Sequence, residues 1–384
     1  MHEFLNKLNL QTLTDEDREH LEKEITSEEI RESIFNTAGG KSPGLDGFPI
    51  EFYRSFLPKL IEPLCSMFNY AIESEKLPDT LEQALITVLL KPGKDPLLCG
   101  SYRPISLLNT SYKILAKLIA LRLDRVLPDL VDMDQTGFVR NRSSPDNIRR
   151  LFNIMHYVEN DQESVVAASL DAEKAFDRIE WNYLFEVLQR MNIGPKYVGL
   201  IRLLYKCPVA QILTNGNISS QFSLSRGTRQ GCPVSPLLFS LAIEPLAEAF
   251  RSHPSIHGVR IGGREHLVSL YADDILLYLT KPEISLRTLV DILKEYGTFS
   301  GYKINLSKSI IMPFNRAAMQ NPILDQPFSW KPQKMTYLGL QIPSEITKTY
   351  QLNYTPLLKK VGEELDRWRD LPISLIGRVN CVKM

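Results

Sequence analysis

The sequence has few of the features that mark secreted or membrane proteins. Its five cysteines are spread over 384 residues and none forms a C-x-x-C pair, which argues against zinc and for reduced thiols inside a cell. The apolar runs 84–90 and 236–246 are much shorter than the ~20 residues that span a bilayer. The first residues lack the basic-then-apolar order of a signal peptide. We therefore expect an intracellular protein without a membrane partner, in either nucleus or cytoplasm.

The chain also lacks a net charge. Lysine plus arginine and aspartate plus glutamate each number 45, so no overall positive field indicates nucleic acid, and any polyanion site must come from local clusters. We find no internal repeat and no low-complexity segment. Since 43% of the residues are hydrophobic, the chain can bury a large core and form two or three subdomains.

Acidic residues stand at the ends of β-like segments. SLYADDILLYL is typical of a hairpin of two short strands with Asp273 and Asp274 at its turn, and VVAASLD of a buried strand that ends at Asp171. If the segments pair in one antiparallel sheet, Asp171 and Asp273 converge, and repulsion between the clustered carboxylates favours a bound cation. Ligand sets made only of oxygen suit magnesium. The alternatives are a solvated turn and, for Asp171, a helix N-cap.

Loops and helices connect these segments. The loop predicted at 91–104 carries Lys91, Lys94 and Arg103 and leads into a long helix. The segment 172–191, after the acidic strand end, is predicted as one helix. The most basic window of the chain contains Arg140, Arg142, Arg149 and Arg150.

SLDAEKAFDRIEW, GTRQGCPVSPLLFSLAIEPLA and YADDILLYL are similar, in this order, to the central palm motifs of reverse transcriptases. KSPGLDGFPIEFY, SYRPISLLNTSYKILAKLIALRL, DQTGFVRNR, FSGYKINLSKS and MTYLGLQI extend the likeness. Together they resemble the polymerase of LINE-type, non-LTR retrotransposons. The resemblance implies an α+β right-hand polymerase with an antiparallel palm sheet, helical fingers and a partial helical thumb. Its parts would be an N-terminal extension (1–33), fingers and palm (34–345) and an incomplete thumb (346–384).

The resemblance also implies an activity. The chain would be an RNA-directed DNA polymerase, a nucleotidyltransferase that adds deoxynucleoside triphosphates to the 3′-hydroxyl of a DNA primer on an RNA template. Two Mg²⁺ ions, with Mn²⁺ as an alternative, would support this phosphoryl transfer. By match to the motifs, Asp171 and Asp273 would bind the metals, the Ala172 carbonyl would be available to them, and Asp274 would support the site.

Further residues take roles from the same resemblance. Lys91 or Lys94 and Arg103 would hold the triphosphate, because arginine offers phosphate a bidentate fork and lysine a point charge. Gln230 would lie against the nucleotide, and Gly231 would let the backbone approach it closely. A solvated loop for Lys94 and an ordinary turn before a helix for the glutamine motif remain as alternatives.

Five more residues follow the family pattern. Lys308 would protonate the departing pyrophosphate, unless it is simply an exposed lysine. Phe176 would exclude a ribose 2′-hydroxyl, unless it is a core ring of a helix. Tyr337, Leu338 and Gly339 resemble the hairpin that positions the primer terminus, although such residues also occur in ordinary strand cores.

The basic window is expected to contact the template. Arg140, Arg142, Arg149 and Arg150 would follow its phosphates, which give affinity without sequence choice. The alternative is a helix with a solvated basic face.

The resemblance has limits, because polyproteins of this type carry an endonuclease before the polymerase and further sequence after the thumb. Neither is found in this sequence, so we expect those regions among the partners of the chain. The chain could be a fragment, a truncated genomic copy or a repurposed gene. Two other functions stay open as well. One is metal-dependent phosphodiester hydrolysis, disfavoured because no histidine or lysine base accompanies the aspartates, and the other is a catalytically silent RNA-binding remnant.

Overall fold

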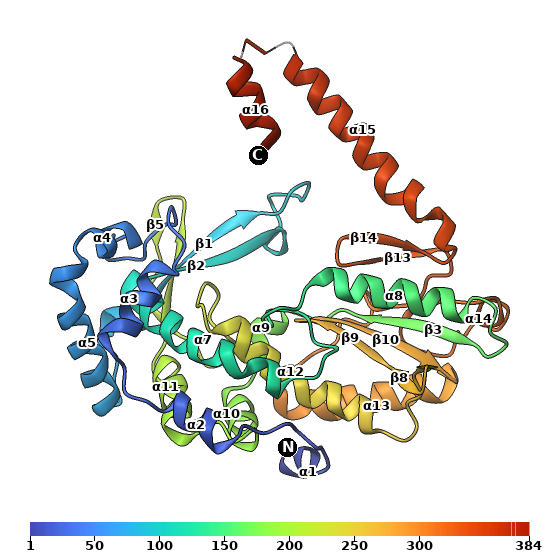
Figure 1. Cartoon of the computed structure of the whole chain (residues 1–384), viewed down its shortest axis with the longest axis horizontal. Helices are drawn as coiled ribbons and strands as arrows, with labels where there is room; N and C mark the ends of the chain where they lie inside the picture. Colours follow the sequence, from blue (N-terminus) through green and yellow to red (C-terminus); the bar gives the residue numbers. More distant parts are fainter. Residues whose placement is uncertain (370, 373, 384) are drawn as a thin grey trace.

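The centre of the molecule is a five-stranded β-sheet, here called the palm sheet (Figure 1). The structure, a computed structural model, describes residues 1–369, 371–372 and 374–383. The strand order is β12-β11-β3-β10-β9, and β3 pairs antiparallel with β10, which places Leu170 opposite Ile275. The strands are β3 (Val165–Leu170), β9 (Val268–Tyr271), β10 (Asp274–Thr280), β11 (Ile310–Pro313) and β12 (Ser329–Trp330). The predicted pairing of the acidic strand with the hairpin is thus confirmed.

Helices cover both faces of the palm sheet (Figure 1). On one face, α8 (Ser144–Val158) packs Leu151 and Met155 against Ala167 and Tyr278 of the strands. The other face carries the main core. It is covered by α10 (Trp181–Arg190), α12 (Ser235–Ser252) and α13 (Pro282–Ser300). Because alternate strand residues enter the two cores, β3 and β10 are mostly apolar between their ends rather than alternating between apolar and polar residues.

A second sheet, here called the fingers sheet, lies within the region 34–345 predicted as fingers and palm, although the resemblance implies helical fingers. Its order is β2-β1-β4-β5, with β6 also paired to β4. The strands are β1 (Gln83–Leu90), β2 (Tyr102–Leu108), β4 (Val209–Thr214), β5 (Asn217–Ile218) and β6 (Phe222–Ser223). The predicted loop 91–104 is therefore too long, because its last three residues already belong to β2. β2 pairs with β1 through seven residue pairs. This pairing makes β2 longer than its short apolar run, PISLL, indicates in the sequence.

Residues 1–33, predicted as an N-terminal extension, contribute to the main core. Leu21 and Ile30 are fully buried. Arg122 of α7 donates to the Glu29 carboxylate at 2.7 Å, which joins this region to the long helix beside it. The helices of this half are α1 (His2–Asn6), α2 (Asp15–Leu21), α3 (Ser27–Phe35), α4 (Ile50–Ser55), α5 (Leu57–Glu73), α6 (Asp79–Glu82), α7 (Thr110–Leu130) and α11 (Pro195–Leu204).

The single helix predicted over 172–191 is wrong. The structure has α9 (Ala175–Arg178) and α10, separated by an extended break. At the break, the Ile179 carbonyl accepts from Gly227 N–H at 2.8 Å, and Glu180 N–H donates to the Ser300 carbonyl at 2.9 Å. These bonds to distant segments replace the helical bonds that the sequence pattern favoured.

The C-terminal part consists of β13 (Lys334–Tyr337), β14 (Leu340–Pro343) and the helices α15 (Thr349–Arg369) and α16 (Leu375–Lys383). The β13–β14 hairpin packs into the core of α8, and α15 extends away from the palm sheet (Figure 1). Asn353 fixes the first turn of α15 to β14, because its side chain accepts from Gln341 N–H and donates to the Gln341 carbonyl, both at 2.8 Å. The remaining elements are β7 (Val259–Ile261), β8 (Arg264–His266) and α14 (Arg316–Gln320).

No helix in the described part of the chain is long and apolar enough to cross a bilayer.

A buried ion cluster lies where α12 meets the loop before α8. Arg251 binds Asp134 at 2.8 Å, Glu244 at 2.9 Å and Glu248 at 3.1 Å. One guanidinium faces three carboxylates, so their charge is not balanced. Burial, joined by the charge of Asp134, raises the pKa of Glu244 to about 7 against the attraction of Arg251. Glu244 is therefore an acid of this cluster that takes up a proton as pH falls through about 7.

This shift predicts how stability depends on pH. The folded chain keeps the Glu244 proton up to about 7 and the unfolded chain only to about 4.5, so this acid lowers the free energy of unfolding as pH rises between those values. In Glu244→Gln that decrease should be absent, and urea unfolding at about pH 5 and about pH 8 measures it. Glu248→Gln, on the same helix and the same arginine, is the control. A variant as pH-sensitive as the wild type would contradict the assignment to Glu244.

Candidate active site

The turn between β9 and β10 presents the predicted acids. Tyr271 pairs with Asp274, so Ala272 and Asp273 form a two-residue loop. Ala272 has φ +55°, a conformation that costs a residue with a Cβ atom free energy and is kept only where its surroundings enforce it. The turn therefore has a shape that its own sequence does not favour.

The third acid adjoins this turn. Asp171 follows Leu170, whose partner is Ile275, so it continues β3 toward the residues of the turn. Its N–H donates to Ser309 Oγ at 3.0 Å, and its carbonyl accepts from Asn305 N–H at 2.7 Å. The N-cap of α9 is Lys174, not Asp171, so the capping alternative is wrong. The structure thus brings together the three predicted aspartates.

The electrostatics of the site reflect this gathering. Burial and, after it, the charge of Asp171 raise the pKa of Asp273. Burial, followed by the charges of Asp273 and Asp171, raises the pKa of Asp274 to about 6, although part of this residue is exposed to solvent. Lys308 Nζ lies 3.9 Å from Asp171 Oδ2. The cluster carries more negative charge than this one lysine neutralises.

The donor atoms suit a hard cation, because all of them are oxygen. Within the described residues, however, no three His, Cys, Asp or Glu side chains already enclose a metal position. The Ala172 backbone is held beside the acids by an isolated bridge to Ile304.

Phe176 lies on α9, five residues after Asp171, and its ring packs on another ring. The ring stacks on Phe239, with centroids 4.2 Å apart and planes at 20°. Phe239 is fully buried, while Phe176 is partly exposed. A bulky ring is thus presented on a rigid support that blocks its retreat into the core.

Gln230 and Gly231 follow on the loop before α12. The Gln230 amide donates to Asp177 Oδ1 at 3.1 Å. Gly231 has φ +78°, and a Cβ atom there would lie 2.9 Å from the Ser106 carbonyl of β2. The close approach that this glycine allows is one between the palm and the fingers sheet.

The predicted triphosphate residues lie on the projecting β1–β2 hairpin (Figure 1). Arg103 is exposed on β2, and Lys94 is exposed in the connecting loop. The Lys91 ammonium donates to the Gly100 carbonyl at 3.0 Å. Arg103 and Lys94 are therefore the freer cations of the hairpin.

The structure divides the four arginines of the basic window. Arg142 donates to backbone carbonyls of its own chain, those of Pro128, Val131, Asp132 and Gln135. Arg150 donates to the Val268 and Met133 carbonyls, both at 3.2 Å. Arg140 and Arg149 are exposed and make ion pairs with acids of their own surface at 3.1 and 3.7 Å. Only this second pair is presented to solvent.

The β13–β14 hairpin carries the residues expected at a primer. Tyr337 is buried, and its hydroxyl accepts from the Asn147 amide at 3.3 Å, so its ring is a core residue. Leu338 and Gly339 form the turn with φ +46° and +81°. The surface of this hairpin is therefore its tip rather than the tyrosine.

Sequence reasoning missed the residues beside the acidic turn. The Gln135 side chain accepts from Ala272 N–H at 3.2 Å. Phe138 has φ +59° and an exposed ring whose centroid lies 6.4 Å from both Phe176 and Tyr271. The sequence signal for these residues is the glutamine and the glycine of DQTGF, a segment that the sequence analysis used only as part of the family resemblance.

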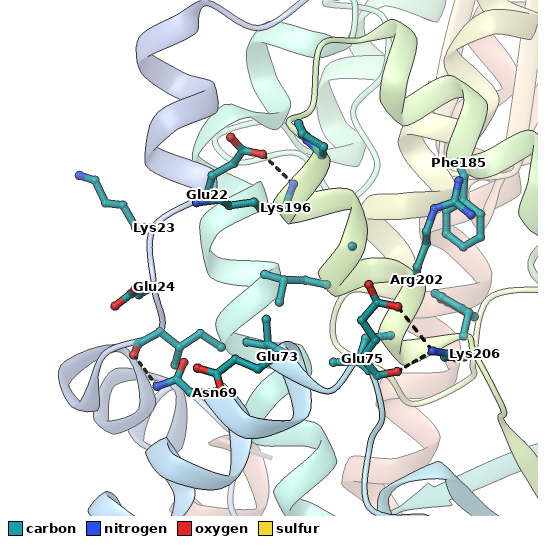
Figure 2. Close-up of a pocket in the computed structure, with 17 residues that line it drawn as sticks. Glu22, Lys23, Glu24, Asn69, Glu73, Glu75, Phe185, Lys196, Arg202 and Lys206 are labelled. Atoms are coloured by element: carbon teal, nitrogen blue, oxygen red, sulfur yellow. Dashed lines mark hydrogen bonds and ion pairs between the residues drawn. The ribbon is translucent and has the colours of Figure 1, made fainter.

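A large cavity of about 900 Å³ lies between residues 22–25, α5 and α11 (Figure 2). The Lys206 ammonium is 3.7 Å from Glu75, and Lys196 N–H donates to the Glu22 carboxylate at 2.7 Å (Figure 2). None of the residues predicted for the site lines this cavity.

Residues 89–342 match the family model described as reverse transcriptase (RNA-dependent DNA polymerase). The chain belongs to the reverse transcriptase family. It is 32% identical over 372 residues to the transposon TX1 uncharacterized 149 kDa protein of Xenopus laevis, a match covering 96% of this chain and 28% of that protein. Membership confirms the predicted α+β polymerase fold.

Other relatives of this reverse transcriptase come from mobile elements. It is 27% identical to the RNA-directed DNA polymerase from mobile element jockey of Drosophila funebris, covering 78% of this chain and 32% of that protein. It is 26% identical to the Pol polyprotein from type-2 retrotransposable element R2DM of Drosophila melanogaster, covering 93% and 31%. The resemblance to non-LTR polymerases is confirmed, and the chain spans about a third of the length of these relatives.

A solved structure of telomerase from Candida albicans, in complex with a fragment of telomeric RNA, aligns with a TM-score of 0.48 at 12% identity, over 78% of this chain and 49% of that one.

Proposed function

We propose that this chain copies RNA into DNA by adding deoxynucleotides to a primer 3′-hydroxyl, as the polymerase part of a non-LTR element. The observation that carries the proposal is the gathering of Asp171, Asp273 and Asp274 at adjoining ends of β3 and the β9–β10 turn. In a member of the reverse transcriptase family, unbalanced carboxylates at this place favour catalysis over a purely structural role.

The carboxylates fit two divalent ions, Mg²⁺ or Mn²⁺, because the donors are all oxygen and because burial, followed by the charges of neighbouring acids, raises the pKa of Asp273 and Asp274. Asp171 and Asp273 would be ligands together with the Ala172 carbonyl, and Asp274 would support them. When bound, such ions activate the attacking hydroxyl and stabilise the leaving phosphate oxygens. Lys308, 3.9 Å from Asp171, is placed to give the pyrophosphate its proton.

Substrate contacts come from the surrounding elements. Arg103 and either Lys91 or Lys94 would bind the triphosphate from the fingers hairpin. Gln230, with Gly231 beside it, would lie against the nucleotide. The RNA template would follow Arg140 and Arg149, and the DNA primer end would meet the tip formed by Leu338 and Gly339. The regions that longer relatives carry remain expected partners.

Asp273→Asn tests the core of this proposal. The change removes a ligand charge but keeps size and fold, so nucleotide addition should fall by at least about 10³-fold while template binding stays unchanged. A primer-extension assay with Mg²⁺, together with a binding assay on the same RNA–DNA duplex, measures both. Asp291→Asn, an exposed position on α13, is the matched control.

The same assay separates the rival functions. Primer shortening instead of extension would favour phosphodiester hydrolysis. Duplex binding without extension in the wild-type chain would favour a catalytically silent RNA-binding remnant.

Phe176→Val tests the choice of sugar. If the ring supported by Phe239 blocks the 2′-hydroxyl, incorporation of ribonucleotides relative to deoxynucleotides should rise by about ten- to a hundredfold. Both efficiencies are measured on one RNA template. Phe299→Val, a partly buried ring on α13, should slow both substrates alike if it slows either. An unchanged ratio in Phe176→Val would remove this ring from the sugar site.

Arg149→Ala tests the template surface. Loss of one phosphate contact should reduce the slope of log affinity against log salt by about 0.7, without changing sequence preference. Arg287→Ala, equally exposed on α13 across the palm sheet, should leave the slope unchanged. Equal slopes for the wild type and Arg149→Ala would place the template elsewhere.

A further inference from the structure

A short segment before α8 lies along the edge of the acidic hairpin. Leu270 of β9 donates its N–H to the Asp134 carbonyl at 2.9 Å, and its own carbonyl accepts from Thr136 N–H at 2.9 Å. Residues 134–136 thus extend the palm sheet beyond its edge strand. The segment ends next to the Ala272–Asp273 turn.

Gln135 reaches from this segment to the turn. Its side chain is fully buried, and Oε1 accepts from Gly137 N–H at 2.9 Å and from Ala272 N–H at 3.2 Å. Both partners are donors, so the amide must present its oxygen here. Its Nε2 has no hydrogen-bond partner among the described residues, an unfavourable position for a buried donor. The side-chain oxygen thus pairs with the N–H of the turn, while the amide nitrogen has no hydrogen-bond partner among the described residues.

Gly137 brings the segment as close to the turn as the backbone allows. A Cβ atom on Gly137 would lie 2.2 Å from Ala272 N and 2.8 Å from the Tyr271 carbonyl carbon. Any larger residue would displace the turn whose Ala272 already has φ +55°.

Two arginines hold the segment in place. Arg251 binds both oxygens of the Asp134 carboxylate, at 2.8 and 2.9 Å. Arg142 donates to the Gln135 carbonyl at 2.9 Å. Because these contacts fix the Gln135 backbone, its side-chain oxygen is a rigid acceptor for the turn rather than an adaptable one.

We propose that Gln135 is a positioning residue that fixes the Ala272–Asp273 turn, so that the Asp273 carboxylate is oriented toward a divalent cation. This inference rests on the proposed function. Without the acceptor, the buried Ala272 N–H is unpaired and the unfavourable φ is no longer enforced, so the turn relaxes and Asp273 loses its orientation. Partners that orient a ligand in this way typically change metal affinity about 10- to 100-fold when removed.

Gln135→Met tests this, because methionine keeps the length and apolar volume but lacks a strong acceptor. The matched control is Thr136→Val, which removes the 3.1 Å bond from Thr136 Oγ1 to the Leu270 carbonyl in the same segment without touching the turn. Mn²⁺ binding is followed by the electron paramagnetic resonance of the free ion, and the binding lost in Asp273→Asn defines the site. Thermal unfolding is measured on each variant.

We expect Gln135→Met to weaken Mn²⁺ binding at this site by about 10- to 100-fold, and Thr136→Val to destabilise the chain while leaving Mn²⁺ binding unchanged. Equal Mn²⁺ binding in Gln135→Met and the wild type would overturn the proposal, as would equal weakening in both variants. If Gln135→Met does not fold, Gln135→Asn, whose shorter amide cannot reach Ala272, is measured instead and decides in the same way.

Metal binding is measured without template or nucleotide, so the two proposals can fail separately. A wild-type chain that binds Mn²⁺ through Asp273 but never extends a primer would contradict the proposed function, and the role of Gln135 would still be decided by its variants.

Discussion

The palm sheet must hold three carboxylates close together at the ends of neighbouring strands, although their charges repel one another. Burial, and after it the charges of neighbouring acids, raises the pKa of Asp273 and Asp274, so groups other than the carboxylates themselves must hold these acids in place. The backbone supplies these groups. The segment 305–309 holds the end of β3, and the segment 134–137 holds the hairpin turn. Two segments that are distant from each other in the sequence thus hold the acids in place.

The palm sheet is buried on both faces, and this burial fixes the strands that the two segments hold. Leu276 and Tyr278 of β10 face the α8 core, while Ile275 and Leu277 face the main core. A slip of one residue would exchange these faces, so the register of β10 on β3 is strongly specified. The position of the acids along the edge is therefore set by packing far from them.

The sequence was sufficient for features that depend on local patterns. The apolar strand and the acidic hairpin could be predicted because their strands are mostly apolar and their acids lie only at a strand end or in the turn. It was not sufficient where tertiary bonds override local preference. The break at Ile179 is stabilised by segments more than 40 residues away, and β2 exists only through its pairing with β1.

Charged and polar side chains were harder still. Arg142 and Arg149 look alike in the sequence, yet one binds backbone carbonyls inside the fold and the other faces solvent. Gln135 could not be recognised because its role depends on a turn that follows 137 residues later. Patterns of residue type predict which segments meet, whereas the direction of a polar side chain follows from the assembled fold.

The attachment of α15 has a mechanical consequence. The helix is fixed to β14 at its first turn through Asn353, and every residue from 354 to 360 is exposed. Its 21 residues form a rod about 30 Å long. If the helix tilts as a rigid body about this attachment, a tilt of about 6° moves its far end by about 3.4 Å, the rise of one nucleotide step in a duplex.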